Sequence, residues 1–120
     1  MRKGVIDVIT LGCSKNLVDS ERLMRQFAYN GFLARHEPRS VGGEIVVVNT
    51  CGFIGSAKEE SINTILSLIE AKKKRKIGKL IVMGCLSERY RDDLIRELPE
   101  VDRFYGKFDW KQIISDIGCS

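Results

Sequence analysis

The predicted fold is built around the stretch Ile45-Val46-Val47-Val48-Asn49-Thr50-Cys51-Gly52. Its four successive β-branched residues, bounded by Gly43 and Gly52, are typical of a strand that is buried on both faces, as in a parallel sheet. The strand runs into a cysteine beside a glycine. The thiol of Cys51 is therefore expected at the point where the strand ends and the chain turns.

Two other segments repeat this pattern. The apolar run Val5–Leu11 is followed by Gly12-Cys13, and the run Leu80–Met83 is followed by Gly84-Cys85. Glycine permits positive φ and a close approach of the backbone to a ligand. The sequence thus predicts three strands that each end in a cysteine next to a glycine.

The remaining elements alternate between strand and helix. We expect strands at Val5–Leu11, Phe32–Ala34, Ile45–Asn49, Lys79–Met83 and Val101–Tyr105. We expect helices from Asn16 or Leu17 to Tyr29, from Ser56 to Lys73, from about Ser87 to before Pro99, and from Asp109 to Gly118. This alternation is typical of a mostly parallel sheet covered by helices. It predicts an α/β, flavodoxin- or Rossmann-like three-layer domain with a five-stranded sheet in the order 2-1-3-4-5.

The predicted topology brings three cysteines together. The carboxyl ends of parallel strands lie at one edge, and ligands bind there near the point where strand order reverses. Cys13, Cys51 and Cys85 follow neighbouring strands, which are spaced at about 4.8 Å. Cys119 follows a helix instead, so we expect it at the opposite edge or in a frayed tail.

Three thiols at one edge allow several chemistries. Free cysteine is often simply buried as a small hydrophobic residue. Structural zinc takes four ligands, usually with pairs two to four residues apart, and no such pair occurs here. His36 is interpreted as an exposed loop residue. Three thiolates without a fourth protein ligand fit an iron–sulfur cluster with one open iron better.

Composition restricts the class of protein. The 120 residues suffice for one domain, and 43% hydrophobic with 30% charged residues indicates a soluble globular chain. No apolar run approaches the roughly 20 residues that span a bilayer, and no signal peptide is visible. We therefore expect a cytoplasmic protein, whose reducing surroundings favour metal binding or reactive thiols over disulfides.

Two further motifs allow other functions. Cys85 and Arg91 have the Cys-x₅-Arg spacing of tyrosine phosphatases, but Glu88 would place a carboxylate in the phosphate loop. The stretch Lys72-Lys73-Lys74-Arg75-Lys76 carries five positive charges, so the rest of the chain is near −1 and the net charge is +4. We interpret this stretch as a solvated helix end that complements the helix dipole. The alternative is a weak contact with RNA phosphates.

Longer motifs resemble a known family. The segments Leu11-Gly12-Cys13-Ser14-Lys15-Asn16-Leu17-Val18-Asp19-Ser20-Glu21, Val48-Asn49-Thr50-Cys51-Gly52-Phe53-Ile54 and Met83-Gly84-Cys85-Leu86 resemble the cysteine segments of the radical SAM methylthiotransferases. The residues of these segments are most similar to those of the branch that modifies an aspartate of a small-subunit ribosomal protein. The other branch modifies an adenosine of transfer RNA.

The resemblance implies a role for each of the three cysteines. Cys13, Cys51 and Cys85 would ligate an auxiliary [4Fe–4S] cluster, whose open fourth iron would hold the sulfur that enters the product. The radical that attacks the substrate would come from S-adenosylmethionine.

Two features of the family do not occur in this sequence. The cluster that generates the radical needs a Cys-x₃-Cys-x₂-Cys motif, and the sequence contains none. The C-terminal substrate-binding domain of the family is also missing. We therefore expect residues 1–120 to be a single N-terminal domain excised from a longer enzyme, and to be inactive alone. A stand-alone metal or redox sensor on the same fold is the non-enzymatic alternative.

Overall fold

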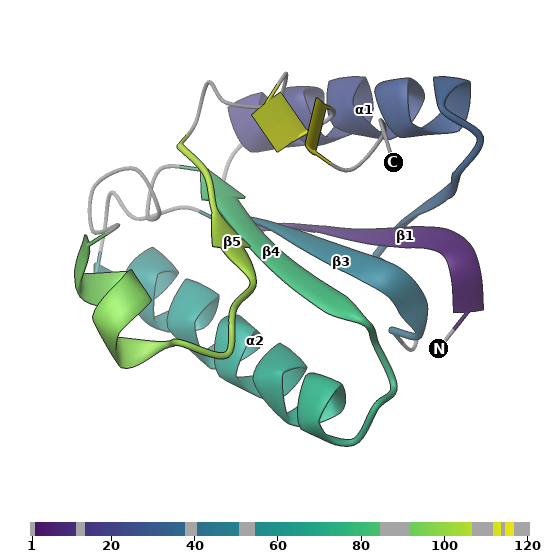
Figure 1. The fold of residues 1–120 in the computed structure, drawn as a ribbon. Coiled ribbons are helices and arrows are strands. Elements are labelled where there is room, and N and C mark those ends of the chain that lie inside the picture. The colour runs from purple at the N-terminus through teal and green to yellow at the C-terminus, as the bar shows by residue number, and fades with distance from the viewer. Residues whose placement is uncertain are drawn as a thin grey trace.

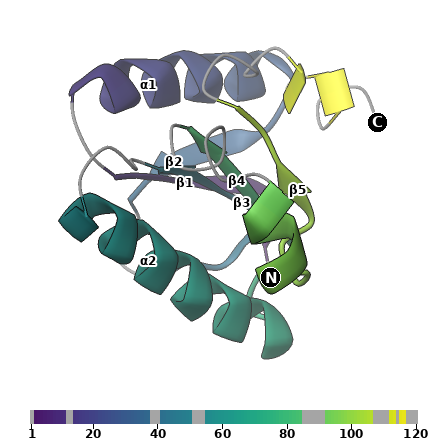
Figure 2. The same cartoon turned by 90° about the vertical axis from the view of Figure 1, so that its left-hand side faces the viewer.

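The computed structural model of the chain describes residues 2–11, 14–37, 41–50, 55–84, 92–106, 112–113 and 115–116. Five strands form one sheet in the order β2-β1-β3-β4-β5, and every pairing is parallel. They are β1 (Arg2–Thr10), β2 (Leu33–His36), β3 (Gly43–Thr50), β4 (Lys79–Gly84) and β5 (Arg103–Phe104). Helices α1 (Ser14–Tyr29) and α2 (Gly55–Lys73) cover opposite faces of the sheet, as Figure 1 and Figure 2 show. The predicted three-layer α/β fold and its strand order are confirmed.

The core lies in two layers, one on each side of the sheet. Val46 and Val48 of β3 pack toward α2 with Ile65, whereas Val47 packs toward α1 with Leu23. All three valines are fully buried, so β3 is covered on both faces as its β-branched run predicted. Burying each such side chain contributes about 1.5–3 kcal/mol. The alternation of side chains along β3 thus joins both layers to one central strand.

The end of β2 differs from its prediction. The sequence placed a strand at Phe32–Ala34 and His36 in the following loop, but β2 extends through His36. His36 is the register partner of Val8 in β1, and this parallel pairing draws the residue into the sheet. The interpretation of His36 as a loop residue is therefore wrong, although its side chain is exposed.

The helices also begin or end close to their predicted positions. α1 starts at Ser14, two residues before the predicted Asn16, and α2 ends at Lys73 as predicted. Residues 92–97 are helical, as are 112–113 and 115–116, within the third and fourth predicted helices. The start of the third helix and both ends of the fourth lie outside the described residues. β5 is shorter than the predicted Val101–Tyr105.

α1 and α2 end in the same backbone motif with different residues. After α1, the Phe32 N–H donates to the Phe27 carbonyl and the Gly31 N–H to the Ala28 carbonyl, with Gly31 at φ +89°. After α2, the equivalent bonds run from Lys76 and Arg75 to Ala71 and Lys72. Arg75 takes the left-handed position at φ +61°, which favours glycine. The predicted end of the first helix at Tyr29 is confirmed. Gly31 is the usual residue for the left-handed position after a helix, whereas Arg75 departs from this choice.

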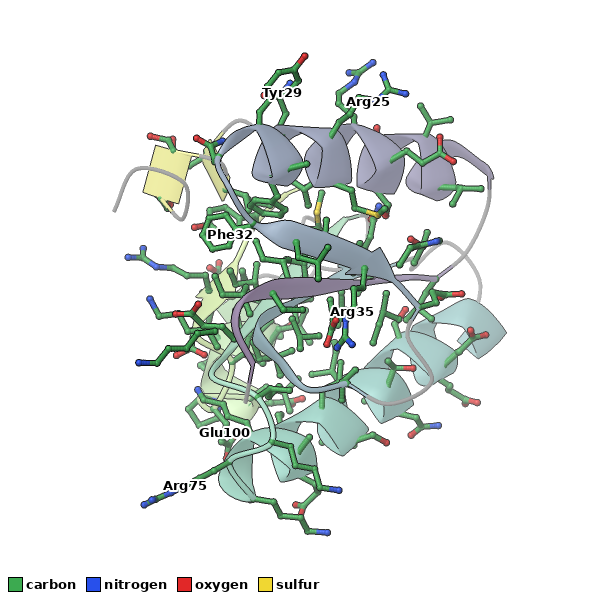
Figure 3. All side chains as sticks on the ribbon, turned by 90° about the vertical axis from the view of Figure 1, so that its right-hand side faces the viewer. Arg25, Tyr29, Phe32, Arg35, Arg75 and Glu100 are labelled. Atoms are coloured by element: carbon green, nitrogen blue, oxygen red, sulfur yellow. The ribbon has the colours of Figure 1, made fainter. Side chains whose placement is uncertain are left out.

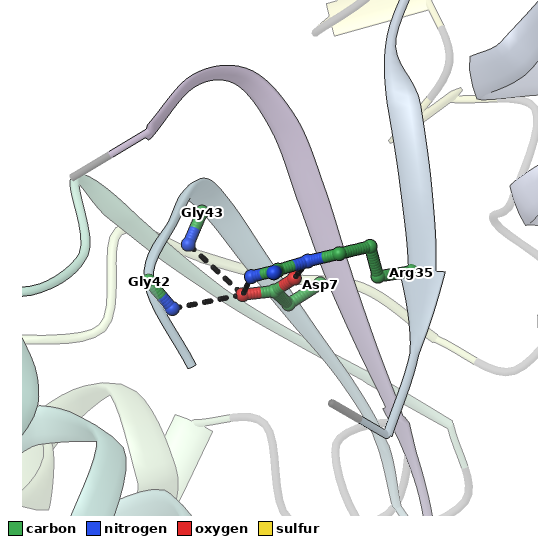
Figure 4. Close-up of polar contacts among 4 residues, drawn as sticks. All are labelled: Asp7, Arg35, Gly42 and Gly43. Atoms are coloured by element: carbon green, nitrogen blue, oxygen red, sulfur yellow. Dashed lines mark hydrogen bonds and ion pairs between the residues drawn. The ribbon is translucent and has the colours of Figure 1, made fainter. Parts of the chain in front are cut away.

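A buried carboxylate on β1 connects that strand to β2 on one side and to the start of β3 on the other, where strand order reverses. Asp7 of β1 is fully buried and accepts bonds from Arg35 of β2 at 2.7 and 3.0 Å. It also accepts from the Gly42 and Gly43 N–H groups, at 3.0 and 2.9 Å, where the chain enters β3 (Figure 4). One side chain therefore ties β1 to both of its neighbours.

Candidate functional site

The carboxyl ends of β1, β3 and β4 lie side by side at one edge of the sheet. Thr10 pairs with Asn49, and Thr50 pairs with Gly84. The Leu11 N–H donates to the Asn49 carbonyl at 2.9 Å, which extends the pairing one residue beyond β1. In Figure 1 these strand ends point toward the left of the view. The sheet thus brings together the three chain segments that lead into the sequence-predicted ligands.

The predicted ligands themselves lie outside the described residues. Thr50 and Gly84 directly precede Cys51 and Cys85 in the sequence, and Leu11 comes two positions before Cys13. Three statements therefore remain predictions: these three cysteines as ligands, the location of Cys119 away from them, and the Cys-x₅-Arg motif. Among the described residues, no group of three or more histidine, cysteine, aspartate or glutamate side chains could hold a metal ion.

Gly84 allows the end of β4 to pack closely against the end of β3. It adopts φ +103°, a conformation that residues with a side chain rarely take. A Cβ added there would lie 2.5 Å from the Thr50 carbonyl oxygen and 2.7 Å from Asn49 Oδ1. The positive φ expected of a glycine at this edge is confirmed at Gly84, whereas the expected close approach of its backbone to a ligand stays a prediction. Gly12 and Gly52 lie outside the described residues.

A chain of polar side chains lies between this edge and α1. Asn49 Nδ2 donates to Ser20 Oγ at 3.1 Å, and Thr10 Oγ1 donates to the same oxygen at 2.7 Å. Ser20 and Asn49 are buried. Next to Asn49, the Thr50 hydroxyl donates to the Met83 carbonyl at 2.7 Å and links β3 to β4. The edge is therefore held by side-chain hydrogen bonds as well as by the sheet ladder.

His36 extends this polar chain to the surface. Its Nε2 lies 2.8 Å from Thr10 Oγ1, and the neighbouring Glu37 approaches the Thr10 N–H at 3.3 Å through Oε1. Sequence reasoning missed Thr10, Ser20, Asn49 and His36 as members of the site. The signal available was position, because Thr10 and Asn49 come at the ends of predicted parallel strands and His36 comes two residues after one.

The basic stretch at the end of α2 lies away from the strand ends. Lys72 Nζ donates to the Glu100 carbonyl at 2.7 Å and contacts Asp102 Oδ2 at 2.8 Å, so Lys72 connects α2 to the segment before β5. Lys73, Lys74, Arg75 and Lys76 are exposed. Figure 3 shows Arg75 extending outward at the end of α2. The outward-facing part of the basic stretch is therefore residues 73–76.

The chain matches known proteins over nearly its whole length. Residues 5–106 match the family described as Uncharacterized protein family UPF0004. The chain is 70% identical over 120 residues to the ribosomal protein uS12 methylthiotransferase RimO of Parabacteroides distasonis, and equally to that of Porphyromonas gingivalis. It is 59% identical over 118 residues to the protein of the same name from Phocaeicola vulgatus.

These relatives are much longer than the chain. The matches cover 100%, 100% and 98% of this chain but only 28%, 28% and 27% of the relatives. The chain thus spans little more than a quarter of the length of the curated relatives it matches. Among the described residues, no helix combines the length and apolar composition needed to cross a bilayer.

Proposed function

The chain belongs to the UPF0004 family, and on that premise we propose that it binds the auxiliary [4Fe–4S] cluster of a ribosomal protein uS12 methylthiotransferase. Cys13, Cys51 and Cys85 ligate three of the irons, and the fourth iron stays open to an exogenous ligand. The observation that carries this proposal is the adjacency of the ends of β1, β3 and β4. Each of these ends is followed within three residues by one of the cysteines.

The residues at this edge fit such a cluster. Thiolate sulfur is the ligand type that iron–sulfur clusters use, and three thiolates leave one iron without a protein ligand. Gly84 lacks the side chain that would otherwise fill the space against Thr50 and Asn49. Asn49, Thr50 and Ser20 are neutral and buried, so they add no carboxylate to the surroundings of an anionic cluster.

The chain's own part in the reaction is to hold and to orient. The parallel ladder fixes the spacing of β1, β3 and β4, and Asp7 adds a tie from β1 to the start of β3 through the Gly42 and Gly43 N–H groups. When bound, the cluster would hold on its open iron the sulfur that is transferred to the substrate.

The remaining functions belong to the part of the enzyme that this chain does not span. We place there the second [4Fe–4S] cluster, the S-adenosylmethionine site and most of the substrate-binding surface, in a radical SAM domain that contacts this domain in cis. Residues 1–120 alone would then have no methylthiotransferase activity. The reaction requires thiolates kept reduced, which agrees with a cytoplasmic location.

The proposed substrate is ribosomal protein uS12, which the relatives' name implies, and the family resemblance implies that the modified residue is an aspartate. The exposed residues Lys73, Lys74, Arg75 and Lys76 would add a weak contact to ribosomal RNA, while Lys72 is engaged within the chain. Such a contact would weaken steeply as salt increases. Transfer-RNA adenosine is the alternative substrate, and a uS12 peptide tested beside an anticodon stem-loop with the full-length enzyme separates the two.

Anaerobic reconstitution with iron and sulfide tests the cluster assignment. Cys13, Cys51, Cys85 and Cys119 are each changed to alanine, and bound iron and sulfide are counted per chain. We expect about four irons in wild type and in Cys119→Ala, and a loss of most of them in each of the other three variants. Cys119→Ala is the matched control because it also removes one thiol.

Three outcomes would contradict the proposal. Iron uptake that depends on Cys119 would place the ligands elsewhere. Equal uptake by all four variants would show that the iron is adventitious. Uptake of one zinc ion in place of iron and sulfide, with the same cysteine dependence, would favour a structural metal site or a thiol-based sensor.

A further inference from the structure

Asn49 occupies an unusual position at the end of β3. It lies two residues before Cys51, and its side chain is buried at 2% exposure. A buried amide must find partners on both of its ends, because an unsatisfied polar group in the interior is strongly destabilising. The two ends of the Asn49 amide face the two neighbouring strand ends.

The nitrogen end connects to β1 through Ser20 of α1. Nδ2 donates to Ser20 Oγ at 3.1 Å, and Thr10 Oγ1 donates to the same oxygen at 2.7 Å. Thr10 is the last residue of β1 and lies three positions before Cys13. Ser20 belongs to α1, so the bridge also ties the helix that follows Cys13 to the end of β3.

The oxygen end faces β4. Oδ1 lies 2.7 Å from the point that a Cβ on Gly84 would occupy, so the amide takes the space that glycine leaves open. Gly84 directly precedes Cys85. The register partner of Asn49 is Met83, whose carbonyl accepts the Thr50 hydroxyl. The same edge of β4 is thus held from both Asn49 and Thr50.

We propose that Asn49 is a positioning residue for the auxiliary cluster, because its single amide spans the strand ends that lead to all three cysteines. This inference rests on the proposed function. An amide suits the position because it offers a donor toward Ser20 and a neutral oxygen toward Gly84. Aspartate would keep the shape but add a negative charge next to an anionic cluster, and alanine would remove both contacts.

The experiment compares Asn49→Ala, Asn49→Asp and Ser20→Ala with wild type after anaerobic reconstitution with iron and sulfide. Ile65→Val serves as the control, because it weakens the core on the α2 face without touching this polar chain. Three quantities are measured: the thermal midpoint of the cluster-free chain, the rate of iron release to a chelator, and the EPR spectrum and midpoint potential of the cluster.

We expect iron release from Asn49→Ala to be about 10- to 100-fold faster than from wild type, the range typical of residues that orient metal ligands. Ser20→Ala should show a smaller increase. Asn49→Asp should retain iron better than Asn49→Ala but shift the midpoint potential to a lower value. Ile65→Val should lower the thermal midpoint while leaving iron release and the EPR spectrum unchanged.

The result separates this inference from the proposed function. Iron bound by wild type, with Asn49→Ala matching it in iron release and EPR spectrum, overturns the positioning role alone. The same holds if Ile65→Val accelerates release as much as Asn49→Ala does, since the effect is then one of general stability. A wild-type chain that binds no iron overturns both.

Discussion

Replacing Asp7 with asparagine tests how the reversal of strand order is held. The change keeps the shape of the side chain but removes the charge that Arg35 contacts at 2.7 and 3.0 Å. An asparagine oxygen in the place of Oδ2 can still accept from Gly42, Gly43 and Arg35 Nη2. The NH₂ group in the place of Oδ1 would instead face the Arg35 Nε–H donor. Hydrogen bonds to charged groups contribute about 1.5–3 kcal/mol each. Arg35 is 27% exposed, so water can solvate part of the released guanidinium. We expect the free energy of unfolding to fall by about 2–4 kcal/mol at neutral pH.

The pH dependence gives a second, signed test of the same pair. Burial raises the pKa of Asp7, but the bonds from Arg35, Gly42 and Gly43 outweigh it and hold the pKa below its usual value. The stabilisation from the carboxylate is therefore complete above the unfolded pKa of about 4, and it is lost as pH falls through the folded pKa. The difference between wild type and Asp7→Asn should close as the solution is acidified below about pH 4.

Urea unfolding followed by circular dichroism measures both effects. The control is Asp93→Asn, which neutralises an exposed aspartate paired with Arg96 and should change the free energy of unfolding by less than about 0.5 kcal/mol. A free energy of unfolding for Asp7→Asn within about 0.5 kcal/mol of wild type at neutral pH would show that the Asp7 carboxylate does not stabilise the fold as described. A difference between the two proteins that widens in acid would show the same.

Three further substitutions test individual contacts, each by urea unfolding. Arg75→Gly should stabilise the chain by about 0.5–1 kcal/mol, because the relief of backbone strain at φ +61° exceeds the entropy that glycine adds to the unfolded chain. Arg75→Ala keeps the strained backbone and should not stabilise the chain. Lys72→Met should cost about 1 kcal/mol through loss of the Asp102 contact, and an unchanged midpoint would show that this bridge contributes nothing. Gly84→Ala should cost about 2–4 kcal/mol, because its Cβ meets the Thr50 carbonyl and its φ of +103° is unfavourable; tolerance of alanine would contradict the close approach described above.

The sheet could be predicted because its signal is local and strong. The β-branched run of β3 requires burial on both faces, and the alternating helices then require parallel crossovers. The end of α1 was also predictable, because a glycine, Gly31, follows it. The boundaries of β2 were harder, because only the pairing with β1 draws His36 into the sheet.

The polar contacts could not be read from the sequence in the same way. Asp7 stands alone in an apolar strand, and nothing local indicates that Arg35 and the Gly42 and Gly43 N–H groups will converge on it. The Asn49–Ser20 bond likewise depends on how α1 docks on the sheet. Arg75 adopts its left-handed conformation against its own preference. These features follow from tertiary packing, so propensity and periodicity carry no signal for them.

The Mössbauer spectrum of the chain reconstituted with ⁵⁷Fe tests whether three thiolates hold the cluster. We expect a [4Fe–4S] cluster in which one iron of the four is distinct from the other three and changes when an exogenous thiol is added. Four equivalent irons whose spectrum does not change when the thiol is added would contradict a site of three thiolates at the ends of β1, β3 and β4. Iron bound without sulfide would contradict it as well.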